Sequence, residues 1–216
     1  MSRILEGTLE FLNNTSVKRR AELARLAGGQ TPEALFITCS DSRIDPNLLT
    51  GTSPGELFVQ RNAGNFVPPP DGGYGSGGEI ATLEYAVNVL RVPHIIICGH
   101  SHCGAITAVL NPESTQPLPA VREWLRCASG VSDHAEQACG DNQENLLVEA
   151  VRQNVRQQLN HLGAWPFVRD AVDEGRLRLH GWMYFIESGQ VDVLDPEGSF
   201  VTLDRSNALA GVPPEF

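Results

Sequence analysis

Three residues of types that bind transition metals lie at or just after the ends of two short apolar segments. His100 and Cys103 are three residues apart in the string GHSHCGA, and Cys39 ends the run ALFITC. Zinc prefers thiolate sulfur and imidazole nitrogen in a tetrahedral set, and three protein ligands with an exchangeable fourth position are typical of a catalytic site. From spacing alone, a catalytic metal site and three unrelated core residues are about equally good interpretations.

The segments around these residues predict an α/β fold with a mainly parallel central sheet flanked by helices. Apolar runs predict strands at 34–37, 57–59 and 94–98. Apolar residues at helical spacing predict helices at 79–90, 105–110 and 144–162. An antiparallel strand pair is expected at 176–186 and 191–194, around a turn. Ligands of open α/β sheets bind beyond the carboxyl ends of the strands, where Cys39 and His100 both lie.

We expect one domain over residues 1–216, with an N-terminal helical arm at 1–28 and a C-terminal tail at 204–216. Residues 3–27 have apolar side chains at helical spacing before Gly28-Gly29, which predicts one or two amphipathic helices. Six glycines and three prolines make regular structure unfavourable at 61–78.

The composition excludes several classes of protein. Lys and Arg total 16 against 26 Asp and Glu, a net charge of −10 that disfavours nonspecific binding to nucleic acid or anionic lipid. No apolar run is long enough to span a membrane, and the N-terminus has no signal-peptide pattern, so a cytoplasmic protein is expected. In that reducing compartment, cysteines close to histidine favour metal binding over disulfides.

Two strings resemble the β-class carbonic anhydrases: CSDSR at 39–43 and GHSHCGA at 99–105. The blocks PGELFVQRNAGN and EYAV between them also match, and LHGWMYFIESG at 179–189 is similar to bacterial and cyanobacterial members of the plant-like branch. The resemblance covers roughly residues 3–203. It implies a zinc cofactor and the reversible hydration of carbon dioxide to bicarbonate and a proton.

The same resemblance assigns roles around the metal. It makes Cys39, His100 and Cys103 the zinc ligands and places Asp41 and Arg43 beside them as a catalytic pair. Arg43 can hold the carboxylate through two parallel hydrogen bonds and keep it off the metal, whose fourth ligand is then water or a small anion. The alternative for the pair is an ordinary loop salt bridge.

The substrate pocket of plant-like members corresponds to Gln30, Phe58 and Tyr85. Phe58 would supply an apolar wall, and Gln30 and Tyr85 would offer hydrogen bonds to the oxygens of the substrate. The branch with a regulatory bicarbonate site has tryptophan where this chain has Phe36, which argues against that regulation. Without the tryptophan, Arg61 is expected to be a structural charge.

The remaining reactive residues have simpler interpretations. Cys98 is expected to be a core thiol, and nothing links Cys127 or Cys139 to a metal. His102 is either a proton relay or a solvated loop residue, and His180 is expected to be packed. Gly99 and Gly104 are expected to let the backbone turn tightly around the metal.

The family buries its active site at a dimer interface, so a homodimer or an assembly of dimers is expected. Two other functions stay open: hydrolysis of another linear molecule such as carbon disulfide, and a noncatalytic zinc protein in an assembly. The sequence also leaves open a location within a bacterial microcompartment and a carboxysome-like partner.

Overall fold

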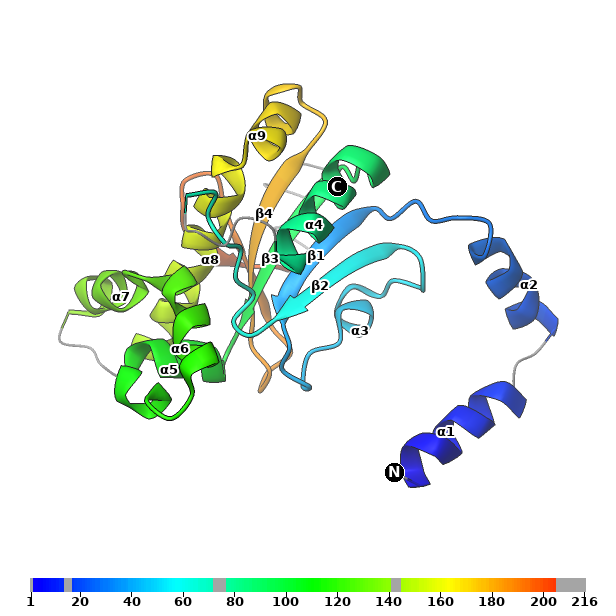
Figure 1. Cartoon of the computed structure of the whole chain (residues 1–216), viewed down its shortest axis with the longest axis horizontal. Coiled ribbons are helices and arrows are strands. Elements are labelled where there is room, and N and C mark those ends of the chain that lie inside the picture. Colours follow the sequence, from blue (N-terminus) through cyan, green and yellow to red (C-terminus); the bar gives the residue numbers. More distant parts are fainter. Residues whose placement is uncertain (1, 14–16, 72–76, 141–144, 205–216) are drawn as a thin grey trace. The chain divides into compact units, whose positions relative to one another are not determined.

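A six-stranded sheet runs through the larger of two units, residues 32–216, of the computed structural model (Figure 1). Its order is β2-β1-β3-β4-β5-β6. The strands are β1 (Ala34–Cys39), β2 (Leu57–Asn62), β3 (His94–His100), β4 (Arg178–Tyr184), β5 (Val191–Leu194) and β6 (Phe200–Thr202). The first four are mutually parallel, and β5 is antiparallel to both neighbours. The predicted parallel sheet and antiparallel pair are confirmed, and β6 extends the pair by one strand.

The structure describes residues 2–13, 17–71, 77–140 and 145–204. The predicted C-terminal tail lies outside these residues except for Asp204. Within the described ranges, no helix has the length and apolar character needed to cross a membrane. The cytoplasmic location and the single-domain boundaries stay predictions.

Helices connect the strands and include the three that were predicted. They are α3 (Pro46–Thr50), α4 (Gly78–Glu84), π-helix η1 (Tyr85–Leu90), α5 (Gly104–Leu110), 3₁₀-helix η2 (Pro112–Thr115), α6 (Pro119–Trp124), 3₁₀-helix η3 (Leu125–Ala128), α7 (Val131–Cys139), α8 (Leu146–Ala164) and α9 (Pro166–Asp173). The predicted helix over 79–90 changes from α to π geometry at Tyr85. Such π segments are rare and occur often near functional sites.

Helix α8 packs directly on β3 and β4 because two strand residues are glycines. A Cβ atom on Gly99 would lie 2.7 Å from Val151 Cγ1, and one on Gly181 would lie 2.9 Å from Val155 Cγ1. Gly99 therefore serves helix packing, and the prediction that it forms a tight turn was wrong. The left-handed residue in the turn after β3 is His102, with φ 55°.

The smaller unit, residues 1–31, contains the two N-terminal helices, α1 (Ser2–Asn13) and α2 (Val17–Leu26). The apolar side chains of α1 are exposed, with 73% of Ile4, 62% of Leu5 and 52% of Leu9 accessible. Apolar residues at helical spacing form one face, and burying such a face is the usual source of helix stability in proteins. Within the described part of the smaller unit, this face of α1 has no cover.

Candidate metal centre

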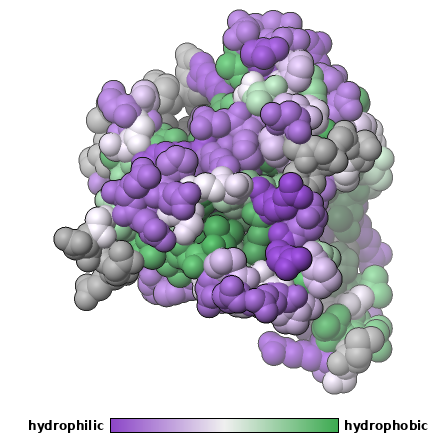
Figure 2. All heavy atoms as spheres, turned by 60° about the vertical axis from the view of Figure 1, so that its left-hand side comes forward, coloured by the Kyte–Doolittle hydropathy of each residue, from purple (hydrophilic) through white to green (hydrophobic). Residues whose placement is uncertain are grey.

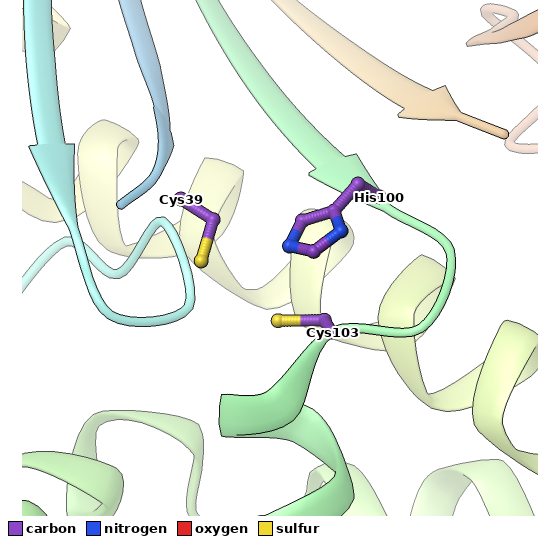
Figure 3. A group of neighbouring side chains, drawn as sticks. All are labelled: Cys39, His100 and Cys103. Atoms are coloured by element: carbon purple, nitrogen blue, oxygen red, sulfur yellow. The ribbon is translucent and has the colours of Figure 1, made fainter. Parts of the chain in front are cut away.

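Three side chains converge at the carboxyl ends of two neighbouring strands (Figure 3). Cys39 ends β1, His100 ends β3, and Cys103 directly precedes α5. Their ligand atoms all lie within 4.8 Å of one another, and all three residues are buried. Donor atoms bound to one zinc ion at about 2.0–2.3 Å are separated by roughly 4 Å, so little movement is needed to hold the ion.

Of the two imidazole nitrogens of His100, one makes a hydrogen bond and the other makes none among the described residues. Its Nδ1 lies 2.8 Å from the carbonyl oxygen of Ser101, which places the ring hydrogen on Nδ1. Its Nε2 is buried and has no hydrogen-bond partner among the described residues. Metal-binding histidines characteristically donate one N–H to a carbonyl and ligate through the other nitrogen. The orphan Nε2 therefore fits a metal ligand.

The two thiols differ in their readiness to ionise. A hydrogen bond from Cys103 lowers the pKa of Cys39 to about 4, and the backbone N–H of Gly64 also donates to Cys39 Sγ at 3.4 Å. The same thiol pair raises the pKa of Cys103 above its usual range, and burial adds to the rise. Each thiol thus shifts the ionisation of the other. Because zinc binds thiolates, its binding would release the protons that the pair still holds.

Asp41 and Arg43 form the predicted pair. Arg43 Nε donates to Asp41 Oδ1 at 2.9 Å and Arg43 Nη2 donates to Oδ2 at 2.7 Å. The backbone N–H of Arg43 adds a third bond to Oδ1, and these bonds hold the pKa of Asp41 well below its usual range. Asp41 Oδ2 lies 4.0 Å from His100 Nε2, so an ionised carboxylate borders the ligand cluster.

Two further residues, to which the sequence motifs assign no part in the site, fix its loops. Arg61 donates to the carbonyl oxygens of Cys39 at 3.0 Å and Asp41 at 2.7 Å, which confirms a structural charge and gives it a specific task. Ser101 is buried, accepts from the N–H of Ile186 at 2.9 Å and donates to Glu187 at 2.6 Å. In the sequence, the only indication of this role is that Ser101 lies between His100 and Cys103 in the string GHSHC.

The predicted pocket residues are only partly brought together. The rings of Phe58 on β2 and Tyr85 on η1 lie 6.1 Å apart, centroid to centroid, and Tyr85 is 46% exposed. Phe58 is in register with Leu35, whereas Cys39 is in register with Asn62. Leu35 and Cys39 are four residues apart on β1, so Phe58 lies about 13 Å along the strand direction from the position of Cys39. Gln30 is exposed and belongs to the smaller unit, so its pocket role stays a prediction.

The other reactive residues lie as expected outside the cluster. Cys98 is fully buried, and burial raises its pKa to about 12. His180 packs against His94, with Nε2 and Nδ1 3.2 Å apart. His102 is largely exposed, 3.5 Å from Glu187.

A hollow of about 410 Å³ lies among the helices that follow Cys103. Its lining includes Ala108, Val109, Arg122 and Leu125, but none of the predicted ligands or pocket residues. Figure 2 turns this side of the molecule forward and shows apolar surface gathered in a hollow within polar surroundings. The hollow is thus distinct from the metal centre.

Comparisons with known proteins agree with this geometry. The profile of the carbonic anhydrase family matches residues 34–191. A carbonic anhydrase of Pseudomonas aeruginosa is 46% identical over 203 residues, covering 90% of this chain and 88% of that protein. The structure of the β-carbonic anhydrase CcaA is similar with a TM-score of 0.88 at 40% identity, covering 94% of this chain and 92% of that one.

A second similar structure comes from a study of two tetrameric β-carbonic anhydrases of the fungus Sordaria macrospora. Its TM-score is 0.79 at 30% identity, and the match covers 93% of this chain and 98% of that one. The family profile spans all three clustered residues, and both structural neighbours are of the β class. The chain therefore belongs to the β-carbonic anhydrase family.

Proposed function

We propose that this protein is a zinc enzyme that catalyses the reversible hydration of carbon dioxide to bicarbonate and a proton. The observation that carries the proposal is the buried Cys39, His100 and Cys103 cluster beside the Asp41–Arg43 pair. Bound zinc would supply a nucleophile at neutral pH by lowering the pKa of water, and three protein ligands leave one tetrahedral position for exchange.

Asp41 and Arg43 would orient the reaction. The ionised Asp41 carboxylate borders His100 Nε2, so its Oδ2 is placed to accept a hydrogen bond from the nucleophile and hold it in one orientation. Arg43 engages both carboxylate oxygens and keeps them from ligating the metal. Two thiolates and a neutral imidazole make the zinc site formally uncharged, whereas a carboxylate ligand would leave it negative.

The first test is carbon dioxide hydration by zinc-loaded protein. We expect about one zinc per chain, because the cluster supplies one three-residue site. Stopped-flow hydration should be fast with zinc, be lost after chelation and return when zinc is added. Carbon disulfide in place of carbon dioxide tests the alternative hydrolase, which family membership disfavours. A zinc-replete protein without hydration activity would favour the noncatalytic alternative and overturn the proposal.

Phe58 and Tyr85, together with Gln30, are proposed to line the pocket for carbon dioxide, with Phe58 as the apolar wall. The strand register puts Phe58 about 13 Å along the sheet from the level of Cys39, too far for contact with substrate at its own metal centre. We therefore propose a homodimer, or an assembly of dimers, in which the Phe58–Tyr85 pair completes the site of another copy. The uncovered apolar face of α1 supports association, and so does the tetrameric state of the fungal relatives.

Mixing two defective variants tests this arrangement. Cys39→Ser removes a metal ligand, and Phe58→Ala removes the proposed wall, so each alone should hydrate carbon dioxide poorly. A mixed dimer contains one intact site, made from the ligands of one copy and Phe58 of the other. After denaturation and refolding together, activity should rise to about a quarter of the parent value, the share expected for random pairing of two-fold dimers.

The control for mixing is Cys39→Ser with Asp41→Asn. Both changes are proposed to affect the ligand-bearing side of the site, so this mixture should gain nothing. Activity of the first mixture no higher than the mean of its two components would place Phe58 in the site of its own copy and contradict the shared arrangement.

A further inference from the structure

One face of α8 presents polar side chains to the segment Asn62–Pro68, which follows β2 and is called here the 62–68 loop. Asn154 and Gln158 are both fully buried. Asn154 donates to Gly64 O at 3.1 Å, and Gln158 accepts from Val67 N at 2.8 Å. His161 Nδ1 lies 2.8 Å from Val67 O. Trp165, directly after the helix, donates from its indole to Pro68 O at 2.9 Å. The backbone of the loop is thus held along its length.

A backbone group of the loop also donates to the candidate metal centre. The N–H of Gly64 donates to Cys39 Sγ at 3.4 Å. The carbonyl of the same peptide unit belongs to Ala63, and it accepts a hydrogen bond from the indole Nε1 of Trp124 at 2.8 Å. The indole, the peptide and the sulfur therefore form one chain of hydrogen bonds, and such chains polarise their members.

The peptide units on both sides of Gly64 are fixed by side chains from different helices. Trp124 of α6 holds the preceding carbonyl, and Asn154 of α8 holds the carbonyl of Gly64 itself. Gly64 has φ +87°, and a Cβ atom there would lie 2.6 Å from the Phe66 ring, so the loop has little freedom to choose another course. With both flanking carbonyls held, the direction of the Gly64 N–H is determined.

We infer that Trp124 and Asn154 are positioning residues for the Cys39 ligand: they aim the Gly64 N–H at its sulfur. The inference rests on the proposed zinc site. Hydrogen bonds to a metal-bound thiolate stabilise its charge and fix its orientation, and losing an outer partner of a metal ligand typically costs about 10–100-fold in metal affinity. Neither residue needs to touch the metal or the substrate.

The test compares the rate at which zinc leaves the folded parent and variants, measured with a chromophoric chelator. Trp124→Phe removes only the indole donor and keeps an aromatic ring against Phe66, 5.9 Å away. Asn154→Leu removes the second donor. Each variant should release zinc about tenfold faster or more. Cobalt-substituted variants should show the thiolate charge-transfer band at longer wavelength, because the sulfur has lost a hydrogen bond.

Each variant has a matched control in the same part of the chain. Trp165→Phe removes an identical indole bond to the far end of the 62–68 loop, and Gln157→Leu changes an α8 side chain that donates to Ser129 O instead. Both should keep the parental zinc release and cobalt spectrum. Asn154→Ser replaces Asn154→Leu if the latter does not fold by circular dichroism.

The outcomes separate this inference from the proposed function. A parent protein that binds no zinc would refute the zinc site itself. If the parent binds zinc and Trp124→Phe and Asn154→Leu release it at the parental rate, the positioning role is wrong. Equal acceleration in Trp165→Phe would mean that general loosening of the loop, and not the aim of one N–H, controls release.

Discussion

Replacing Cys39 or Cys103 by serine is expected to strip zinc from the protein and abolish nearly all carbon dioxide hydration. Each thiol is one of three clustered donors, and a hydroxyl is a far poorer ligand for zinc than a thiolate. The remaining two donors cannot hold the ion against a chelator. Elemental analysis after dialysis, followed by stopped-flow hydration, measures both losses.

Cys98→Ser is the matched control for these variants. Cys98 is equally buried and lies on β3 only two residues before His100, but it is outside the cluster. This variant should keep about one zinc per chain, even if its unfolding temperature falls. Full zinc occupancy in Cys39→Ser and Cys103→Ser would contradict the ligand assignment.

Asp41→Asn is expected to keep zinc and lose about a hundredfold or more of the hydration rate, the usual scale for removing a positioned acceptor. The asparagine retains one oxygen for Arg43 but has no negative charge, and its amide group would face a guanidinium donor. Zinc content should stay at the parental value because Asp41 pairs with Arg43 and is not a member of the ligand cluster.

Asp133→Asn controls for the loss of one negative charge. Asp133 is exposed in the first turn of α7, so its variant should hydrate carbon dioxide at the parental rate. Loss of zinc from Asp41→Asn would indicate that the carboxylate is a ligand, and parental activity would remove it from the reaction. A crystal with Asp41 oxygen about 2.0 Å from zinc near neutral pH would also refute the open site.

The sequence was sufficient to predict the strands that carry the ligands. β1 and β3 are buried on both faces, so their apolar runs are continuous and easily recognised. Cys39 and His100 end these strands, and parallel strands place their carboxyl ends at one edge of the sheet. For this reason Cys39 and His100 could be expected to meet despite their separation in the chain.

Other features could not be predicted because they depend on tertiary contacts. The turn chemistry assigned to Gly99 depended on local sequence, but its actual role is the close approach of α8, a partner far along the chain. The helix over 144–162 was predicted from its apolar side. Its spacing did not predict that Asn154 and Gln158, four residues apart on it, hydrogen-bond the 62–68 loop, because that loop lies far away in the sequence.

The distribution of the three clustered residues over the chain determines when the proposed metal centre can form during synthesis. Cys39 and His100 become neighbours only when β1 pairs with β3, and that pairing joins segments from different parts of the chain. No short segment contains the set, so a nascent chain that ends before Cys103 cannot complete it. Zinc capture at the proposed site would therefore require the pairing of β1 with β3. Small zinc domains differ, because there the ion organises a local segment.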